Sequence, residues 1–305
     1  MKIGIVGGSG LIGSFLAHSI IDKGDSVVIF SRKSSLPLSL RNKDRISLIS
    51  AQIPLEDDLE ALDVLINLAG EPIVGAKWTP ERKEELRASR VDLTRAIFEN
   101  LKKCQKLPST YIAGSAIGFY GAYDEDQPEC TETSPPGDDF LSALCVEWEN
   151  ASLEFKNLGL RTLVLRTGVV LTTKGGALAQ MLPAFRTFVG GVVNPGTQIL
   201  SWIHMEDLVS AILHLLYDDS LSGIFNLTSP NPVSNEIFSN ELASVLHRPC
   251  IFRIPNFALE FIYGEGAVLV YKGQKVLPKR LEETNFRFKF PEIRPALEDL
   301  LKVSL

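Results

Sequence analysis

The fold is decided by a stretch near the N-terminus, Lys2-Ile-Gly-Ile-Val-Gly-Gly-Ser-Gly-Leu-Ile-Gly13. Its first part, Lys2–Val6, is a short apolar run typical of a buried parallel strand. Apolar residues then recur at helical spacing from Leu11 to Ile20, and Gly24 is a natural helix stop. A second apolar run, at 26–30, predicts the next strand. The chain therefore opens with a strand, a glycine-rich loop, a helix and a strand.

Each glycine of the loop has a different physical role. Gly7 permits a tight turn, Gly10 lets a pyrophosphate approach the backbone, and Gly13 lets the helix pack on the strand. The pyrophosphate would sit on the free N–H groups at the helix N-terminus. An ordinary glycine loop is the alternative, but the strand–loop–helix–strand context favours dinucleotide binding. The cofactor contacts expected from this loop are Gly7, Ser9, Gly10, Leu11, Ile12 and Gly13.

Strands and helices continue to alternate through the first half of the chain. Apolar runs at 46–49, 61–69, 110–115 and 161–166 predict strands, and helices are expected from Pro80 to about Cys104 and from Asp138 or Asp139 to about Leu158. This pattern predicts an α/β protein with a Rossmann-type doubly wound parallel sheet. We expect a nucleotide-binding domain over 1–168. A smaller C-terminal α/β substrate lobe over 169–305 would follow, with some chain crossing back.

The bulk composition excludes several classes of function. The chain has 305 residues, of which 45% are hydrophobic and 22% charged, and its net charge is −6. A nucleic acid is not expected as a partner because nothing supplies a basic footprint. We expect no metal site, because the four cysteines are scattered and indicate reduced thiols. No signal peptide or membrane-spanning run is visible. The expectation is a cytoplasmic monomer or homodimer that binds a small molecule.

The end of the second predicted strand indicates which dinucleotide would bind. An acidic residue at this place would bind the ribose 2′-hydroxyl of NAD, but the sequence here is Phe30-Ser-Arg-Lys33. Arg32 and Lys33 suit a 2′-phosphate, with Ser31 as a further hydrogen-bond donor. The alternative is that the two cations begin a solvated loop. We predict NADP(H) as the cofactor.

Several further motifs resemble those of a known family. Together with the glycine loop they are Asn67-Leu-Ala-Gly-Glu-Pro-Ile73, Gly114-Ser-Ala-Ile-Gly-Phe-Tyr-Gly121, Ser134-Pro-Pro-Gly-Asp-Asp-Phe140, Arg166-Thr-Gly-Val-Val-Leu171, Gly175-Gly-Ala177, Ser201-Trp-Ile-His204, Gly273-Gln-Lys-Val-Leu-Pro278 and the closing segment Phe286–Leu301. From end to end the chain resembles the atypical extended short-chain dehydrogenases/reductases of the "epimerase family", loosely described as nucleotide-sugar epimerases.

The resemblance implies further cofactor contacts. Leu68 and Ala69 would line the adenosine side and Val170 the nicotinamide side, although core packing is an equal alternative for all three. Glu85 and Arg90 would face the cofactor edge, with surface pairing as their alternative. The full set implied by the resemblance is Leu68, Ala69, Gly70, Glu85, Arg90, Ser115, Arg166 and Val170.

The catalytic set departs from the family pattern. The usual chemistry uses Ser or Thr together with Tyr-x-x-x-Lys, in which the Tyr transfers the substrate proton and the Lys lowers its pKa. Ser115 takes the first position, whereas Phe140 and Leu144 fall where the Tyr and Lys would stand. Ser115 and Tyr120 are the candidate catalytic residues. A packed loop aromatic is the alternative for Tyr120.

Two functions from different classes follow. The first is an NADP(H)-dependent oxidoreductase or epimerase that acts on a small polar substrate, nucleotide-linked compounds included. The second is a non-catalytic NADP(H)-binding sensor or scaffold, which the missing Tyr-x-x-x-Lys pair motivates. Whether the chain is an enzyme at all is left open by the sequence.

Overall fold

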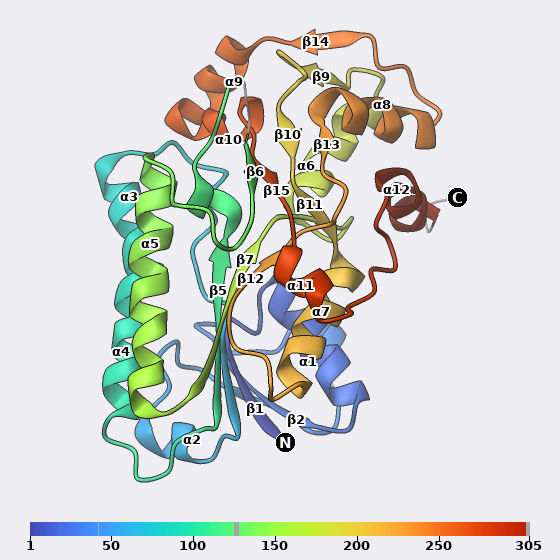
Figure 1. The fold of residues 1–305 in the computed structure, drawn as a ribbon. Helices are drawn as coiled ribbons and strands as arrows, with labels where there is room; N and C mark the ends of the chain where they lie inside the picture. The colour runs from blue at the N-terminus through green and yellow to red at the C-terminus, as the bar shows by residue number, and fades with distance from the viewer. Residues whose placement is uncertain (42, 125–127, 303–305) are drawn as a thin grey trace.

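The structure is a computed structural model that describes residues 1–41, 43–124 and 128–302. Its centre is a parallel sheet of seven strands in the order β12-β7-β5-β4-β1-β2-β3 (Figure 1). This arrangement confirms the predicted Rossmann-type doubly wound sheet. The strands are β1 (Lys2–Val6), β2 (Ser26–Phe30), β3 (Ile46–Ile49), β4 (Val64–Asn67), β5 (Thr110–Ala116), β7 (Arg161–Thr167) and β12 (Gly223–Leu227).

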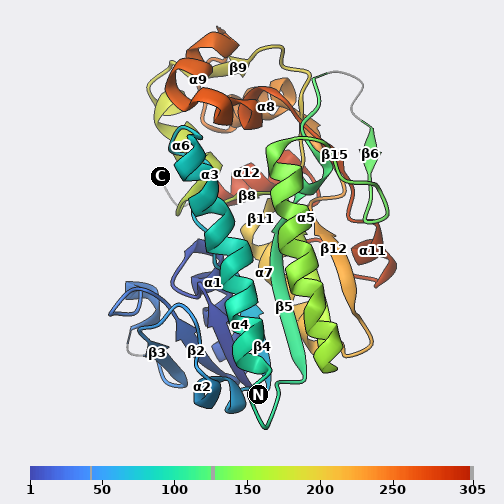
Figure 2. The same cartoon turned by 90° about the vertical axis from the view of Figure 1, so that its left-hand side faces the viewer.

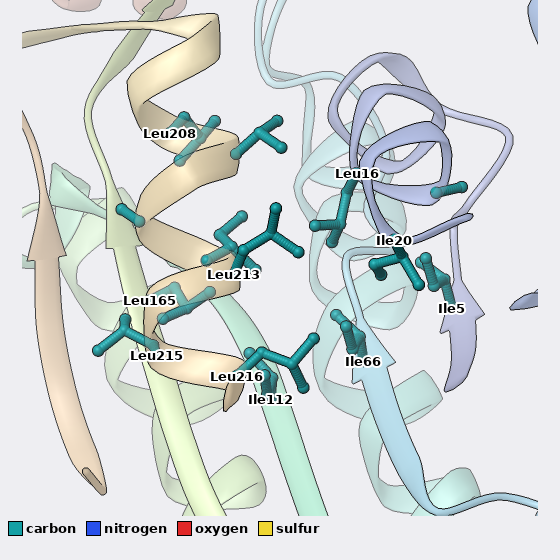
Figure 3. Close-up of a cluster of buried hydrophobic side chains, with 14 of the residues drawn as sticks. Ile5, Leu16, Ile20, Ile66, Ile112, Leu165, Leu208, Leu213, Leu215 and Leu216 are labelled. Atoms are coloured by element: carbon teal, nitrogen blue, oxygen red, sulfur yellow. The ribbon is translucent and has the colours of Figure 1, made fainter. Parts of the chain in front are cut away.

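Helices cover both faces of this sheet because successive strand residues point to opposite sides. Ile3 and Ile5 of β1 pack under α1 (Leu11–Asp22) and α7 (Met205–Tyr217), in the core shown in Figure 3. On the other face, Val6 belongs to a second core that includes α4 (Leu93–Leu101). That face also carries α5 (Phe140–Leu153), as Figure 2 shows. The short α2 (Glu56–Glu60) packs on α4.

The helix starts follow the sequence, but two helices end differently from the prediction. Thr79 accepts a hydrogen bond from Arg82 N–H at 3.2 Å, and Asp139 accepts one from Ser142 N–H at 2.8 Å, so both are N-caps as their residue types predict. The helix expected over 80–104 is divided into α3 (Pro80–Arg87), a π-helical segment (Ala88–Asp92) and α4. π-Helical turns of this kind occur often at functional sites. The helix expected to reach residue 158 continues beyond α5 as a 3₁₀ segment, Glu154–Leu158.

The rest of the chain forms smaller elements, most of them above the carboxyl ends of the strands, whereas α11 (Lys279–Glu283) packs beside β12 (Figure 1). Within the expected lobe, residues 205–217 and 223–227 return to the central sheet as α7 and β12. The boundary at 168/169 stays a prediction. The smaller elements are β6 (Glu129–Cys130), β8 (Val169–Leu171), α6 (Gly176–Arg186), β9 (Gly191–Val193), β10 (Ile199–Leu200), β11 (Trp202–His204), β13 (Val233–Ser234), α8 (Asn235–Val245), β14 (Phe252–Ile254), α9 (Asn256–Tyr263), α10 (Val268–Tyr271), β15 (Lys275–Val276), α11 (Lys279–Glu283) and α12 (Ile293–Leu301).

None of the helices within the described ranges combines the length and the apolar character that a membrane crossing requires.

Candidate functional site

The glycine loop joins β1 to α1, and Gly7, Gly10 and Gly13 have separate roles in it. Gly7 has a φ of +77°, and a Cβ there would lie 2.9 Å from the backbone of Ala69. A Cβ at Gly13 would lie 2.7 Å from the Gly7 carbonyl oxygen, so the helix packs directly on the turn. Among the described residues, a Cβ at Gly10 would meet only that same oxygen, at 3.1 Å. Gly7 and Gly13 are therefore required by the chain itself, whereas Gly10 leaves open space in front of the helix.

The N-terminus of α1 is suited to an anion. Its hydrogen bonding begins with Ser14 N–H donating to Gly10 C=O at 3.0 Å, so the N–H groups of Leu11 and Ile12 come before the first helical bond. No side chain caps the helix, and its first turn contains no acidic residue. The free donors and the helix dipole both favour negative charge at this point.

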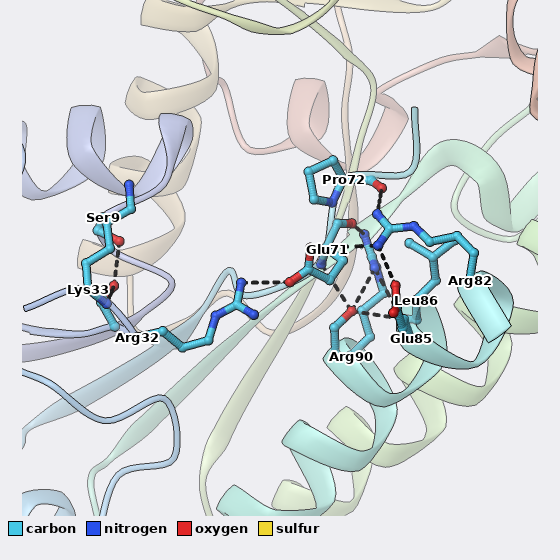
Figure 4. A network of polar contacts seen from close by, with 11 residues as sticks. Ser9, Arg32, Lys33, Glu71, Pro72, Arg82, Glu85, Leu86 and Arg90 are labelled. Carbon is cyan, nitrogen blue, oxygen red and sulfur yellow. Dashed lines mark hydrogen bonds and ion pairs between the residues drawn. The ribbon is translucent and has the colours of Figure 1, made fainter. Parts of the chain in front are cut away.

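The three residues that follow β2, Ser31, Arg32 and Lys33, differ in burial and in hydrogen-bond partners. Ser31 is buried, its hydroxyl lies 2.6 Å from the Ser9 hydroxyl, and it accepts a hydrogen bond from Lys33 N–H at 3.1 Å. Arg32 extends over the surface and donates from Nη2 to Glu71 Oε1 at 2.7 Å (Figure 4). Ser31 thus joins the glycine loop to β2, while Arg32 and Lys33 are the exposed cations of this edge.

The segment after β4 carries Leu68, Ala69 and Gly70 to the glycine loop. It starts at the buried Asn67, whose Oδ1 accepts a hydrogen bond from Ala69 N–H at 3.2 Å. Ala69 is buried and Leu68 half-buried, and Leu68 packs on the core below α1. The structure brings Leu68 and Ala69 against Gly7. Their contact with a cofactor stays a prediction.

Arg90 holds the next part of this segment in place. Its guanidinium lies against Gly70, where a Cβ would be 2.9 Å from Cζ, and Nη2 donates to Glu71 C=O at 2.8 Å. Burial lowers the pKa of Arg90 to about 10. Glu85, by contrast, is exposed and paired with Arg82 at 2.8 Å. Arg90 therefore supports the loop from behind, and Glu85 forms the surface pair that was its alternative.

A second helix start approaches the glycine loop from the smaller elements. A Cβ at Gly175, which precedes α6, would lie 3.3 Å from Leu11 Cδ2, so the beginnings of α6 and α1 are neighbours. A Cβ at Gly176 would lie 3.7 Å from the Val170 carbonyl oxygen. The structure thus places Val170 near the start of α6, which neighbours the start of α1.

Ser115 and Arg166 are buried and belong to an ion-pair network inside the protein. Glu149 of α5 receives Arg166 Nε at 2.8 Å and Nη2 at 2.7 Å, and Ser115 Oγ donates to the same carboxylate at 2.6 Å. The side chains of Arg166 and Glu149 are only 3% and 4% exposed. Burial would lower the pKa of Arg166, but the hydrogen bonds and charge of Glu149 outweigh it and raise that pKa.

Tyr120 is the other end of this network. It is fully buried, accepts a hydrogen bond from Arg166 Nη1 at 3.0 Å and donates to Asn226 Oδ1 at 2.7 Å. Burial raises the pKa of Tyr120 to about 12. Its hydroxyl is therefore fully used inside the protein and holds its proton more tightly than a free tyrosine does.

Phe140 and Leu144, which stand where the family's Tyr and Lys would be, lie on the side of α5 that packs on Trp78. The Phe140 ring packs on Trp78, with the centroids 5.4 Å apart, and Leu144 belongs to the same cluster as Trp78. Leu141 and Cys145 of α5 lie against the segment that follows β5. A Cβ at Gly118 would lie 3.4 Å from Leu141 Cβ and 3.8 Å from Cys145 Sγ. Neither pair of positions supplies a tyrosine or a lysine.

Comparison with known proteins identifies the family. The model of the NAD dependent epimerase/dehydratase family matches residues 3–228. The chain belongs to this family. A second model, a domain of unknown function, matches residues 254–300. The predicted resemblance to the epimerase family group is thereby confirmed.

Relatives within this epimerase family match the chain over its length. The chloroplastic SDR39U1 homologue of Arabidopsis thaliana, an epimerase family protein, is 35% identical over 99% of this chain and 87% of its own. An epimerase family protein of Staphylococcus aureus is 36% identical over 98% of both chains.

Solved structures share the fold of this chain. The human epimerase family protein SDR39U1, isoform 2, crystallised with NADPH, has a TM-score of 0.86 at 29% identity and covers 99% of both chains. UDP-glucuronic acid 4-epimerase from Bacillus cereus in complex with NAD has a TM-score of 0.79 at 16% identity, which shows the fold alone.

Sequence reasoning missed two acidic residues of this epimerase family chain. Glu71 directly follows the Asn67–Gly70 motif, so its place at a strand end was a usable signal. Glu149 lies on α5 among buried neighbours such as Cys145 and Trp148. A carboxylate on the core-facing side of a helix signals a buried cation, and Arg166 at the end of an apolar strand was the candidate.

Proposed function

We propose that the chain binds NADP(H) across the carboxyl ends of β1, β2 and β4. The observation that carries this proposal is the open space at Gly10, in front of a helix N-terminus without an acidic residue or a side-chain cap. Pyrophosphate oxygens would accept hydrogen bonds from the first N–H groups of α1. Arg32 and Lys33 would meet the 2′-phosphate, and Leu68 and Ala69 would contact the adenosine. The NADPH in the human SDR39U1 crystals supports the choice of cofactor.

The chemistry proposed for the bound cofactor is that of an oxidoreductase or epimerase acting on a small polar substrate. The nicotinamide would give or take a hydride at its C4 atom. Val170 and the start of α6 would border that end, because they lie beside Leu11. Nucleotide-linked sugars are a suitable substrate class, since structural neighbours include a UDP-glucuronic acid 4-epimerase crystallised with its sugar nucleotide.

One observation favours a second candidate, a non-catalytic NADP(H)-binding protein. Leu141 and Cys145 lie against the segment that follows β5. A leucine and a cysteine cannot replace the proton-transferring tyrosine and the lysine that lowers its pKa. Burial raises the pKa of Cys145 to about 12, so its thiol is a poor proton donor near neutral pH. Ser115 and Tyr120 have committed their hydroxyl protons to Glu149 and Asn226. Proton transfer by these side chains would require the buried network to open.

The experiment that tests the proposal separates binding from chemistry. NADPH binding is measured first, by the change in nicotinamide fluorescence on titration with protein. The protein is then incubated with NADPH deuterated at C4 and a panel of ketones and 4-keto sugars. In a separate reaction it is incubated with NADP⁺, which accepts the hydride that the carbon bearing a sugar hydroxyl gives up, and UDP-sugars. NADPH binding together with substrate-dependent loss of deuterium, or with conversion of a UDP-sugar to its epimer, would establish the enzyme. Binding without either reaction would favour the sensor or scaffold, and absence of binding would contradict both.

A further inference from the structure

Glu71 lies between two arginines on the adenosine side of the proposed cofactor site, and its distances to the two differ. Glu71 Oε1 receives Arg32 Nη2 at 2.7 Å, whereas Glu71 Oε2 lies 3.9 Å from Arg82 Nη1. Arg32 follows β2 and Glu71 follows β4, with β1 between those two strands. The strand order therefore places the Arg32–Glu71 pair, drawn in Figure 4, across the carboxyl end of β1. Two strand spacings amount to roughly 9–10 Å, a span that two long side chains can bridge.

The backbone of Glu71 is held firmly while its side chain reaches out. Glu71 N–H donates to Ser89 Oγ at 3.1 Å, and Glu71 C=O accepts from Arg90 Nη2 at 2.8 Å. Ser89 and Arg90 both belong to the π-helical segment. This fixed anchor directs the carboxylate across the site toward Arg32, whose own side chain is 70% exposed.

We propose that Glu71 is an intramolecular competitor of the cofactor 2′-phosphate for Arg32. This inference rests on the proposed NADP(H) binding. With no dinucleotide bound, the Glu71 carboxylate holds the Arg32 guanidinium. When NADP(H) binds, Arg32 turns to the 2′-phosphate, because a dianionic phosphate is the stronger partner of a guanidinium. NAD(H) lacks that phosphate and leaves the Arg32–Glu71 pair intact.

Arg82 makes the exchange feasible because it remains beside Glu71. Its Nη2 donates to Pro72 C=O at 2.6 Å and its Nη1 to Glu85 at 2.8 Å, so the side chain is held in place. The carboxylate that Arg32 releases therefore still has a cation within 3.9 Å. The exchange costs little, since exposed ion pairs of this kind contribute only a fraction of a kcal/mol to about 1 kcal/mol.

The test uses Glu71→Gln, which keeps the shape of the side chain and removes its charge. NADPH affinity is expected to rise roughly two- to five-fold, because Arg32 no longer has to leave a carboxylate. NADH affinity should change less than two-fold. Glu84→Gln is the matched control: it removes the same charge from the same region, where Glu84 is exposed and lies 3.5 Å from Arg87. NADPH affinity in the control should stay within two-fold of wild type.

A double-mutant cycle with Arg32→Ala makes the test specific. In the Arg32→Ala background, Glu71→Gln should raise NADPH affinity less than two-fold, because the contested cation is gone. An equal gain in both backgrounds, an equal gain for NADH, or no gain at all would overturn the competition. Glu71→Asp, which keeps the charge but shortens the reach to Arg32, should give a smaller gain if Glu71→Gln fails to fold. A wild type that binds neither dinucleotide would instead defeat the proposed function itself.

Discussion

Two arginine–glutamate pairs at the carboxyl end of the same sheet have opposite characters. Arg32 and Glu71 meet on the surface, where the arginine side chain is 70% exposed. Arg166 and Glu149 meet inside the protein, where both side chains are less than 5% exposed. A surface pair can exchange partners at small cost, whereas a buried pair that loses one partner leaves an uncompensated charge in the interior. Ligand exchange is therefore suited to the ends of β1, β2 and β4, and structural support to the ends of β5 and β7.

Glu149→Gln should have the largest effect, because it removes the charge that compensates the buried Arg166. We expect the free energy of unfolding to fall by about 3–5 kcal/mol. Urea denaturation followed by circular dichroism measures this change. Glu147→Gln is the control on the same helix, since Glu147 is 46% exposed and pairs with the surface residue Arg87. A loss of stability equal in the two variants would show that burial does not distinguish the pairs.

Gly10→Val should abolish cofactor binding in a folded protein, with a modest loss of stability because its Cβ would lie 3.1 Å from the Gly7 carbonyl oxygen. Gly10 has a φ of −76° and an extended backbone, which any residue can adopt. The added side chain would fill the space kept for the pyrophosphate. A loss of NADPH affinity greater than roughly 100-fold, or about 2.7 kcal/mol, is expected. Tight NADPH binding by a folded Gly10→Val protein would show that the phosphates lie elsewhere.

His204→Asn should give a smaller, pH-dependent effect on stability and none on binding. His204 is buried, its Nδ1 accepts a hydrogen bond from Glu206 N–H at 3.1 Å, and its Nε2 lies 3.5 Å from Asp299. Burial lowers the pKa of His204 below its ordinary value of 6.5, and the nearby Asp299 opposes this shift only in part. Between the lowered pKa and 6.5, the unfolded chain binds more protons than the folded one. The stability that this residue contributes is therefore present above pH 6.5 and lost as the pH falls through the lowered pKa.

Asparagine can still cap α7 but does not titrate. Unfolding measured from pH 8 to pH 5 should therefore show a shallower decline in His204→Asn than in wild type. NADPH affinity should be the same in both proteins. Parallel stability curves would mean that His204 does not titrate in this range.

The sequence sufficed for the fold because its signals are local. The glycine spacing in 7–13 predicted the turn and the helix start, and Thr79 and Asp139 were identifiable as caps from residue type alone. The long apolar runs predicted the buried parallel strands, since these strands are covered on both faces.

The site was harder to predict because it depends on contacts between distant segments. Glu149 and Arg166 are 17 residues apart, and no local pattern shows that they meet. Phe140 and Leu144 were assigned by their position in the motif, and a motif does not show which neighbours a helix face packs on; Phe140 packs on Trp78. Arg32 was predicted as a cation at the correct edge, but its partner Glu71 follows a different strand.

The central claim is that NADP(H) binds at the carboxyl ends of β1, β2 and β4. Its most direct test is a comparison of the affinities for NADPH and NADH. Calorimetric titration of wild type and Arg32→Ala with NADPH and NADH compares the four affinities under one buffer and salt concentration. A charge-assisted phosphate contact of about 1.5–3 kcal/mol predicts that wild type binds NADPH roughly ten-fold or more tightly than NADH. Arg32→Ala should lose most of that preference and keep its NADH affinity. Equal affinities for NADPH and NADH in wild type would contradict the account.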